Sequence, residues 1–200
     1  FALTLKSGDT ILADRLLLAS GSSPQGYAIA QALGHRIEPP VPSLFTFNLQ
    51  DDRLQDLAGV AVSTAQLRLQ TTEKSTLEQS GPVLITHWGL SGPAVLKLSA
   101  WGARALHDSD YRAKLWINWL PQMNPETLRS QLLAVKSQLP RRAVSGSCPV
   151  PIPRRLWEKL TLAVGIAPET RWAELSNKAL NALLQELTHG EYWVTGKGAF

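Results

Sequence analysis

The chain has 200 residues, of which 44% are hydrophobic and 18% charged, a composition typical of a folded globular protein rather than a disordered or fibrous one. No apolar run approaches the ~20 residues of a membrane-spanning helix, and no signal-peptide pattern is present, so no membrane partner is expected. The single cysteine, Cys148, excludes an internal disulfide and a cysteine-cluster zinc site. We therefore expect a cytoplasmic protein without a metal site.

The first 40 residues predict a small strand-and-helix segment. Residues 1–18 alternate around a turn at residues 7–9, which indicates a hairpin, and the continuous apolar run at residues 16–19 predicts a strand buried on both faces. Ser23 and Pro24 then predict the start of a helix that Gly34 ends. Prolines at positions 39, 40 and 42 predict an extended connector and the first domain boundary.

The next part of the chain has a hydrophobic period of two. Residues 44–49, 66–70 and 114–119 alternate as strands do, and the polar residues 71–80 predict a hairpin loop. One helix is predicted from residue 92 to about residue 106. The pattern indicates a small β-barrel or sandwich formed by residues 41–122 together with residues 191–200.

From Asn124 onward the period changes to 3.6. Asn124 and Pro125 predict a helix start, followed by an apolar stripe, a second helix that ends at Gly165, and a third that begins at Ser176 and ends before Gly190. Residues 123–190 are therefore predicted to form a three-helix subdomain nested in the β subdomain, which makes the fold class α+β.

The residues most suggestive of a site form a strand, a turn and a helix start at residues 81–96. A predicted buried strand ends at Thr86 and His87, which lead into a turn bounded by glycines. Ser91 stands at the position of a helix cap, two residues before a proline. His87 is suited to hydrogen bonding with a ligand, and free N–H groups at a helix start hold anions. The alternatives are a histidine satisfied by backbone and a simple cap, and the sequence leaves both open.

Several segments in order along the chain resemble one known family. The Thr86–Pro93 block is Thr-His-Trp-Gly-Leu-Ser-Gly-Pro, and Ala19-Ser20-Gly21-Ser22, Gly26-Tyr27, Gly34-His35, Pro42-Ser43-Leu44 and residues 196–200 stand in the same order. These segments resemble the YhiN/BaiN-like FAD-dependent oxidoreductases, also called the aminoacetone oxidase family. Members open with a Gly-x-Gly-x-x-Gly turn that this chain lacks. We therefore expect an excised middle piece, with residues 1–40 left from a Rossmann-like FAD-binding domain.

The resemblance implies a flavoprotein that transfers hydride through FAD, linked to NAD(P)H or to a small amine or carbonyl compound. This chain would be the substrate or lid domain, inactive alone and without affinity for FAD, and its partners would be the rest of its FAD-binding domain and a small-molecule substrate. His87 is the candidate catalytic residue. The candidate cofactor-binding residues are Ala19, Ser20, Gly21, Thr86, His87, Gly89, Ser91 and Gly92.

Two other functions remain open. The helices at residues 153–189 resemble helix-two-turn-helix modules that hold nucleic acid, with Arg154, Arg155, Lys159, Arg171 and Lys178 as the basic residues. The second alternative is a protein-interaction domain. The net charge of +4 is small and the basic doublets are few, so a nucleic-acid partner is not expected.

Overall fold

The computed structural model describes residues 1–72 and 75–198, which divide into one unit at residues 1–40 and another at residues 41–200. The smaller unit holds the antiparallel hairpin of β1 (Ala2–Thr4) and β2 (Thr10–Leu12) and the helix α1 (Pro24–Ala32), which confirms both predictions. Residues 16–19 form no strand, and Leu17 is 88% exposed, so that prediction is wrong. A strand is buried on both faces only when other elements pack against each face, and the unit at residues 1–40 provides no such cover for residues 16–19.

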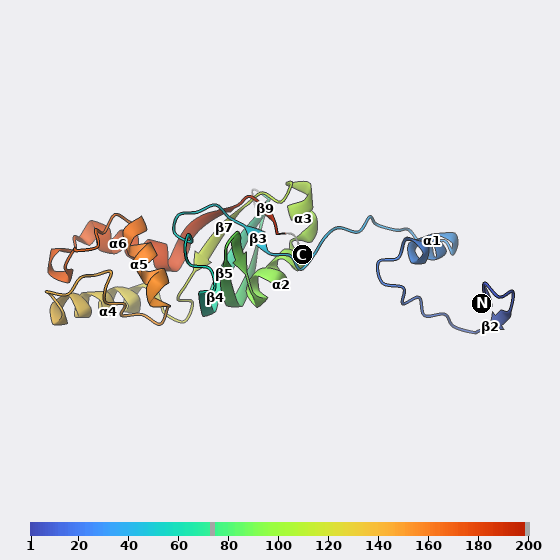
Figure 1. Ribbon diagram of the computed structural model, residues 1–200, viewed down its shortest axis with the longest axis horizontal. Coiled ribbons are helices and arrows are strands. Elements are labelled where there is room, and N and C mark those ends of the chain that lie inside the picture. Colours follow the sequence, from blue (N-terminus) through green and yellow to red (C-terminus); the bar gives the residue numbers. More distant parts are fainter. Residues whose placement is uncertain (73–74, 199–200) are drawn as a thin grey trace. The chain divides into compact units, whose positions relative to one another are not determined.

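The larger unit is built on one antiparallel sheet of seven strands, in the order β8-β7-β4-β5-β6-β3-β9 (Figure 1). The strands are β3 (Phe47–Asn48), β4 (Ala61–Thr72), β5 (Ser75–Thr86), β6 (Gly89–Ser91), β7 (Ala113–Asn118), β8 (Gly190–Val194) and β9 (Gly196–Lys197). With the helices, this confirms the α+β class.

The two edges of this sheet come from one short segment. β8 pairs with β7 at one edge, β9 pairs with β3 at the other, and only Thr195 separates β8 from β9. Thr195 donates its backbone N–H to the Asn48 carbonyl oxygen at 2.9 Å, which fixes the bend. The sheet is therefore strongly curled and barrel-like, although no ladder joins β8 to β9 directly.

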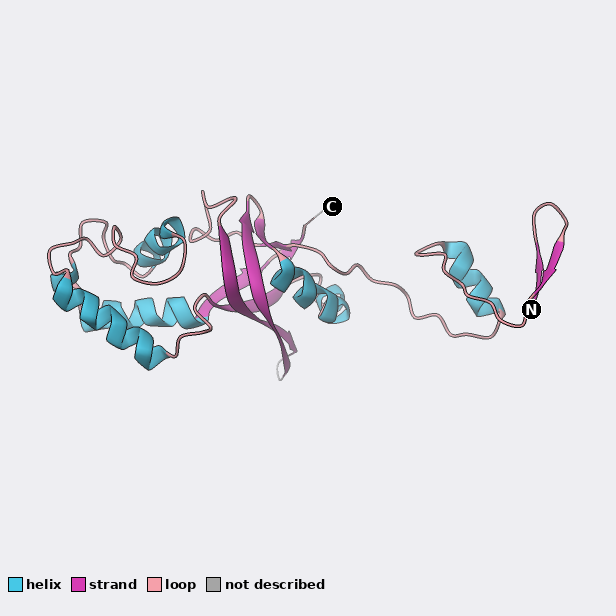
Figure 2. Cartoon of the chain, turned by 90° about the horizontal axis from the view of Figure 1, so that it is seen from below, coloured by secondary structure: helices cyan, strands magenta, loops and turns pink. Residues whose placement is uncertain are grey.

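Alternation along the strands separates an inner face from an outer one. In β7, Ala113, Leu115 and Ile117 are buried, and the residues between them point the other way. Two helices pack at the same core, α2 (Pro93–Trp101) and α3 (Ala103–Asp108), both visible beside the sheet in Figure 2. The single helix predicted here is two, because the chain turns at Gly102, where a Cβ would lie 3.2 Å from a Leu69 methyl group.

The loop predicted at residues 71–80 is mostly strand. β4 and β5 each run for 12 residues, to Thr72 and from Ser75, and residues 73–74 of the predicted loop lie outside the described residues. The segment lacks apolar alternation because both of its faces are largely exposed beyond the core. Residues 75–80 nevertheless form a strand because they pair with residues of β4 across the ladder.

The helices α4 (Pro125–Gln138), α5 (Arg154–Ala163) and α6 (Asn177–His189), with the 3₁₀ turn η1 (Trp172–Glu174), gather at one end of the larger unit (Figure 1). Asn124 caps α4 by accepting from Thr127 N at 2.7 Å, and Ser176 caps α6 by accepting from Ala179 N at 3.1 Å, as predicted. Buried Trp157 stacks on Trp172 with the ring centroids 6.4 Å apart. Among the described residues, no helix has the length and apolar character needed to cross a bilayer.

Candidate functional site

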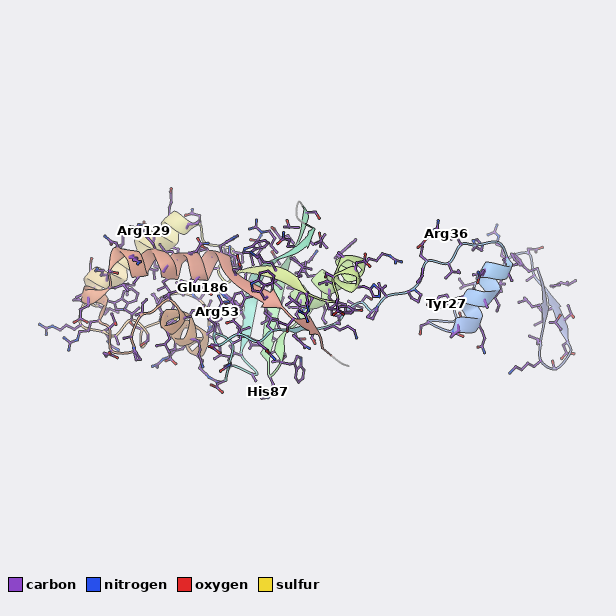
Figure 3. The ribbon with its side chains drawn as sticks, turned by 90° about the horizontal axis from the view of Figure 1, so that it is seen from above. Tyr27, Arg36, Arg53, His87, Arg129 and Glu186 are labelled. Carbon is purple, nitrogen blue, oxygen red and sulfur yellow. The ribbon has the colours of Figure 1, made fainter. Side chains whose placement is uncertain are left out.

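The predicted Thr-His pair lies at the end of a tight hairpin. Thr86 at the end of β5 pairs with Gly89 at the start of β6, and Thr86 Oγ1 donates to the Gly89 carbonyl oxygen at 3.2 Å. His87 and Trp88 form the turn between them, and Trp88 is 51% exposed. Figure 3 shows His87 at the outer edge of the larger unit. The paired strands β5 and β6 therefore hold the turn in place and expose the His87 imidazole to solvent.

Two adjoining surface hollows meet at this hairpin. They measure about 490 Å³ and 460 Å³, and Thr86, His87, Leu54 and Gln55 line both. The opposite wall is the loop of residues 49–58, which brings Gln50 and two carboxylates, Asp51 and Asp52, into the first hollow. The structure thus supplies an imidazole, amides and carboxylates around one open space, a set that holds a polar ring by its edge.

The two glycines of the motif are required by packing inside the larger unit. Gly89 has φ of 148°, and a Cβ there would lie against the Phe47 carbonyl oxygen and 2.6 Å from Leu49 N, so glycine allows β6 to lie beside β3. Gly92 has φ of 98°, and a Cβ there would lie 2.8 Å from the Pro82 carbonyl oxygen. Their contact with a cofactor stays a prediction.

The predicted helix cap is displaced by one residue. Ser91 remains in β6, paired with Leu84, and Gly92 is the residue from which α2 begins, without a side-chain cap. The reason is the positive φ of Gly92, which turns the chain sharply out of the ladder. The helix start lies beside Pro82 and Leu84, and neither Ser91 nor Gly92 lines the two hollows.

The remaining predicted cofactor residues belong to the other unit. Ala19, Ser20 and Gly21 precede α1 in the smaller unit, and a Cβ on Gly26 would lie 2.9 Å from Ser20 Cβ. Gly21 has φ of 60° with open space around it, which suits a turn and a close approach equally. Of the eight predicted residues, the structure therefore brings Thr86, His87 and Gly89 together at the hollows.

An arginine that the sequence did not single out fixes the loop opposite His87. Arg53 Nε donates to Asp51 Oδ1 at 2.8 Å, and Nη1 donates to Glu186 Oε1 in the last part of α6 at 2.8 Å (Figure 3). The guanidinium lies over the Tyr192 ring, 3.7 Å from its centroid, and its side chain is 17% exposed. Arg53 therefore joins the site loop to a helix and a strand at once.

Charge balance explains why this cluster is tolerated in a partly buried place. Burial by itself lowers the pKa of Arg53, but the hydrogen bond to Asp51 and the charges near it outweigh burial and raise the pKa. Burial, together with Glu186, raises the pKa of Tyr192, whose hydroxyl donates to Glu186 Oε1 at 3.1 Å. Arg53 and Tyr192 therefore both keep their protons at neutral pH.

The helix α5 holds the same loop from a second point. Arg155 donates to the Asp56 carbonyl oxygen, and Lys159 Nζ lies 3.4 Å from Asp56 Oδ2. Arg154 pairs with Glu158 at 2.8 Å. Three of the five basic residues of the nucleic-acid alternative are thus engaged within the protein, and the three-helix subdomain supports the wall of the candidate site. In the described part of the chain, no group of three potential metal ligands occurs.

This chain is similar to several known proteins. One, named ribosomal RNA dihydrouridine synthase, from Escherichia coli K12, is 32% identical over 94% of the chain and 46% of its own length. Another of that name, from Haemophilus influenzae, is 29% identical over 88% of the chain and 40% of its own length. A 3-dehydro-bile acid delta(4,6)-reductase from Clostridium scindens is 29% identical over 61% of the chain and 31% of its own length.

The chain thus spans less than half the length of these relatives. The family model described as "HI0933-like protein barrel and H2TH domain" matches residues 41–200, which are the larger unit described above. This match agrees with the resemblance to the YhiN/BaiN-like flavoproteins and with the curled sheet and its helices. The chain belongs to the HI0933-like protein family, and residues 41–200 are the barrel and H2TH domain of that family.

Proposed function

We propose that this chain is the substrate-covering domain of a flavin-dependent reductase, and that the hollows beside His87 receive the ring to be reduced. The ends of the larger unit lie side by side, since Phe47 pairs with Lys197 and Gly198 N donates to the Thr46 carbonyl oxygen at 2.8 Å. When one domain is inserted into another, the chain enters and leaves the inserted domain at adjacent positions. This geometry supports a cover attached to a flavin domain by two adjacent strands.

The hollow suits a substrate ring better than a dinucleotide. Asp52 lines it, and its carboxylate repels a pyrophosphate, whereas the charge of Asp51 is balanced by Arg53. His87, Gln50 and Gln55 supply hydrogen-bond donors for ring carbonyl groups. We therefore assign the hollow to the substrate, with the flavin ring as its other wall, while the phosphates of FAD are held elsewhere in the full-length protein.

The names of the relatives indicate which type of reaction the full-length protein catalyses in this proposal. Formation of dihydrouridine and a delta(4,6)-reduction both add hydrogen across a carbon–carbon double bond in a ring. Reduced FAD supplies the hydride for such a reaction when bound, with NAD(P)H as its source. The protein must hold the ring and deliver a proton to the neighbouring carbon. His87 lines the hollow, and its imidazole is the group that we assign to that proton transfer.

A uracil ring in RNA is the substrate class that the comparisons favour. The relative named for ribosomal RNA matches 94% of this chain at 32% identity, whereas the bile-acid reductase matches 61% of it at 29%. The amides and carboxylates of the hollow offer partners for both the N–H and the carbonyl groups of such a ring. This substrate class is part of the proposal and is tested separately below.

Replacing His87 with Ala in the full-length protein should slow reoxidation of the reduced flavin by substrate by about 100-fold, because general acid catalysis contributes ~10²–10⁴-fold. The melting temperature should hardly change, because His87 lies on an exposed turn. Anaerobic stopped-flow absorbance measures the first and thermal unfolding the second. The control is His107→Ala, which removes an exposed histidine on α3. It should change neither the reoxidation rate nor the melting temperature. Normal turnover by His87→Ala with a large loss of stability would make His87 a structural residue.

A further inference from the structure

The outer face of the curled sheet carries two tryptophans flanked by cations. On β7, Lys114 and Trp116 alternate with buried residues and therefore point outward. The register places Arg68 of β4 opposite Trp116, and Trp193 of β8 opposite Lys114. Trp116 and Trp193 are consequently diagonal neighbours on adjacent strands. This surface, called here the Trp116–Trp193 face, lies apart from the residues around His87.

Distances show that the cations lie over the indole rings. The Arg68 guanidinium carbon is 5.1 Å from the Trp116 ring centroid, and Lys114 Nζ is 5.6 Å from that of Trp116 and 5.2 Å from that of Trp193. His189 stacks beside Trp116 with the centroids 5.8 Å apart and the planes 26° from parallel. Trp193 is 57% exposed, so much of this aromatic surface is open to solvent although Lys114 lies over the ring.

A small hollow of about 90 Å³ opens beside Trp116. Its lining gathers side-chain amides, a guanidinium, an imidazole and a carboxylate, from Gln66, Arg68, Glu78, Asn118 and His189. An aromatic wall with hydrogen-bonding groups around it matches a planar heterocycle that carries donors and acceptors along its edge.

Charge distinguishes the kind of nucleic acid. Lys114 pairs with Glu191 at 3.0 Å, and the hollow is lined by Glu78 as well as by Arg68, so the face has little net positive charge. Duplex binding depends on neutralising many phosphates, whereas a single strand also gains affinity from bases that stack on aromatic side chains. The pairing of Lys114 is itself exposed and weak, so a phosphate competes with Glu191 for the ammonium group.

We propose that the Trp116–Trp193 face binds two successive bases of a single-stranded RNA segment. One base lies in the hollow against the edge of the Trp116 ring, beside Gln66 and Asn118. The next base stacks on Trp193, and Lys114 contacts the phosphate between them. The proposal rests on the RNA substrate class of the proposed function. It replaces the expectation, drawn from the small net charge and the few basic doublets, that a nucleic acid is not a partner. It uses the sheet rather than the basic helices.

The test measures binding of a fluorescein-labelled uridine dodecamer to the full-length protein by anisotropy, at several salt concentrations. Trp193→Ala should weaken binding about tenfold, because one stacked base is worth a factor of that order, and Trp193→Phe should restore most of it. Trp101→Ala on α2, a tryptophan that is 74% exposed on another element, is the matched control and should bind as the wild type does. Lys114→Gln should lower the salt slope by about 0.7, the value for one phosphate of a single strand.

Specific results would overturn the proposal. Equal affinities of Trp193→Ala and Trp101→Ala, or undiminished binding of an abasic dodecamer, would show that bases do not stack on this face. If the wild type does not bind the dodecamer while its reduced flavin is reoxidised by a small activated alkene, this proposal fails and the reductase proposal stands. If the dodecamer binds as predicted but His87→Ala reoxidises normally, the assignment of His87 fails instead.

Discussion

Replacing Arg53 with Met should lower the free energy of unfolding by about 3 kcal/mol, the lower end of the cost of removing one partner from a buried ion pair, because the three side chains keep 14–19% exposure. The substitution keeps much of the side-chain volume over Tyr192 but leaves Asp51 and Glu186 without their shared cation. Chemical denaturation followed by tryptophan fluorescence measures the change. The loop at residues 49–58 loses its link to α6, so substrate affinity at the hollow should fall as well.

Two further variants separate the ion-pair effect from a general loss of structure. Glu186→Gln added to Arg53→Met removes one of the stranded carboxylates and should recover part of the lost stability. Arg154→Ala breaks the exposed pair with Glu158, whose members are 69% and 38% exposed, and should cost less than about 0.5 kcal/mol. An Arg53→Met variant no less stable than Arg154→Ala would refute the role assigned to the cluster.

Replacing Gly89 with Ala should be at least as harmful, with a loss of about 3 kcal/mol or more, because the added methyl group collides with backbone that cannot move away. The Cβ would lie against the Phe47 carbonyl oxygen and 2.6 Å from Leu49 N, which are atoms of the neighbouring strand and its continuation. Separation of β3 from β6 would release the turn that carries His87. Thermal unfolding and hydrogen exchange at the Leu49 amide, which donates to the Trp88 carbonyl oxygen, report this directly.

Gly59→Ala is the matched control for that experiment. Gly59 also has a positive φ, 86°, but a Cβ there would have nothing within 4 Å. Its substitution therefore costs the backbone strain alone, about 1–2 kcal/mol. Similar losses at both positions would mean that strain, and not the close approach of β6 to β3, makes Gly89 necessary.

Local interactions were the part of the fold that could be predicted. The caps at Asn124 and Ser176 use hydrogen bonds to residues three positions away, and the hairpin of β1 and β2 follows from a turn between two alternating runs. The Thr86–His87 turn was found for the same reason. Each of these features depends on residues that are close together in the sequence, where spacing and residue type carry the information.

Features that depend on distant residues were missed or misplaced. Residues 71–80 look like a loop until β4 and β7 are seen to form the sheet that orders them, and Ser91 looks like a cap until its ladder partner Leu84 is known. The loop opposite His87 carried no motif. Its importance comes from Arg53, whose partner Glu186 lies 133 residues further along the chain.

The sequence by itself determined the α+β class, the helix starts, the family and the presence of a polar turn at His87, because periodicity, capping and a local motif carry them. Only the tertiary structure decided what surrounds that turn. The hollow exists because the curled sheet brings β3 beside β6, and because Arg53, Arg155 and Lys159 attach residues 49–58 to two helices. The Trp116–Trp193 face likewise arises from register between strands, and pairing over such distances depends on the whole core rather than on any local pattern.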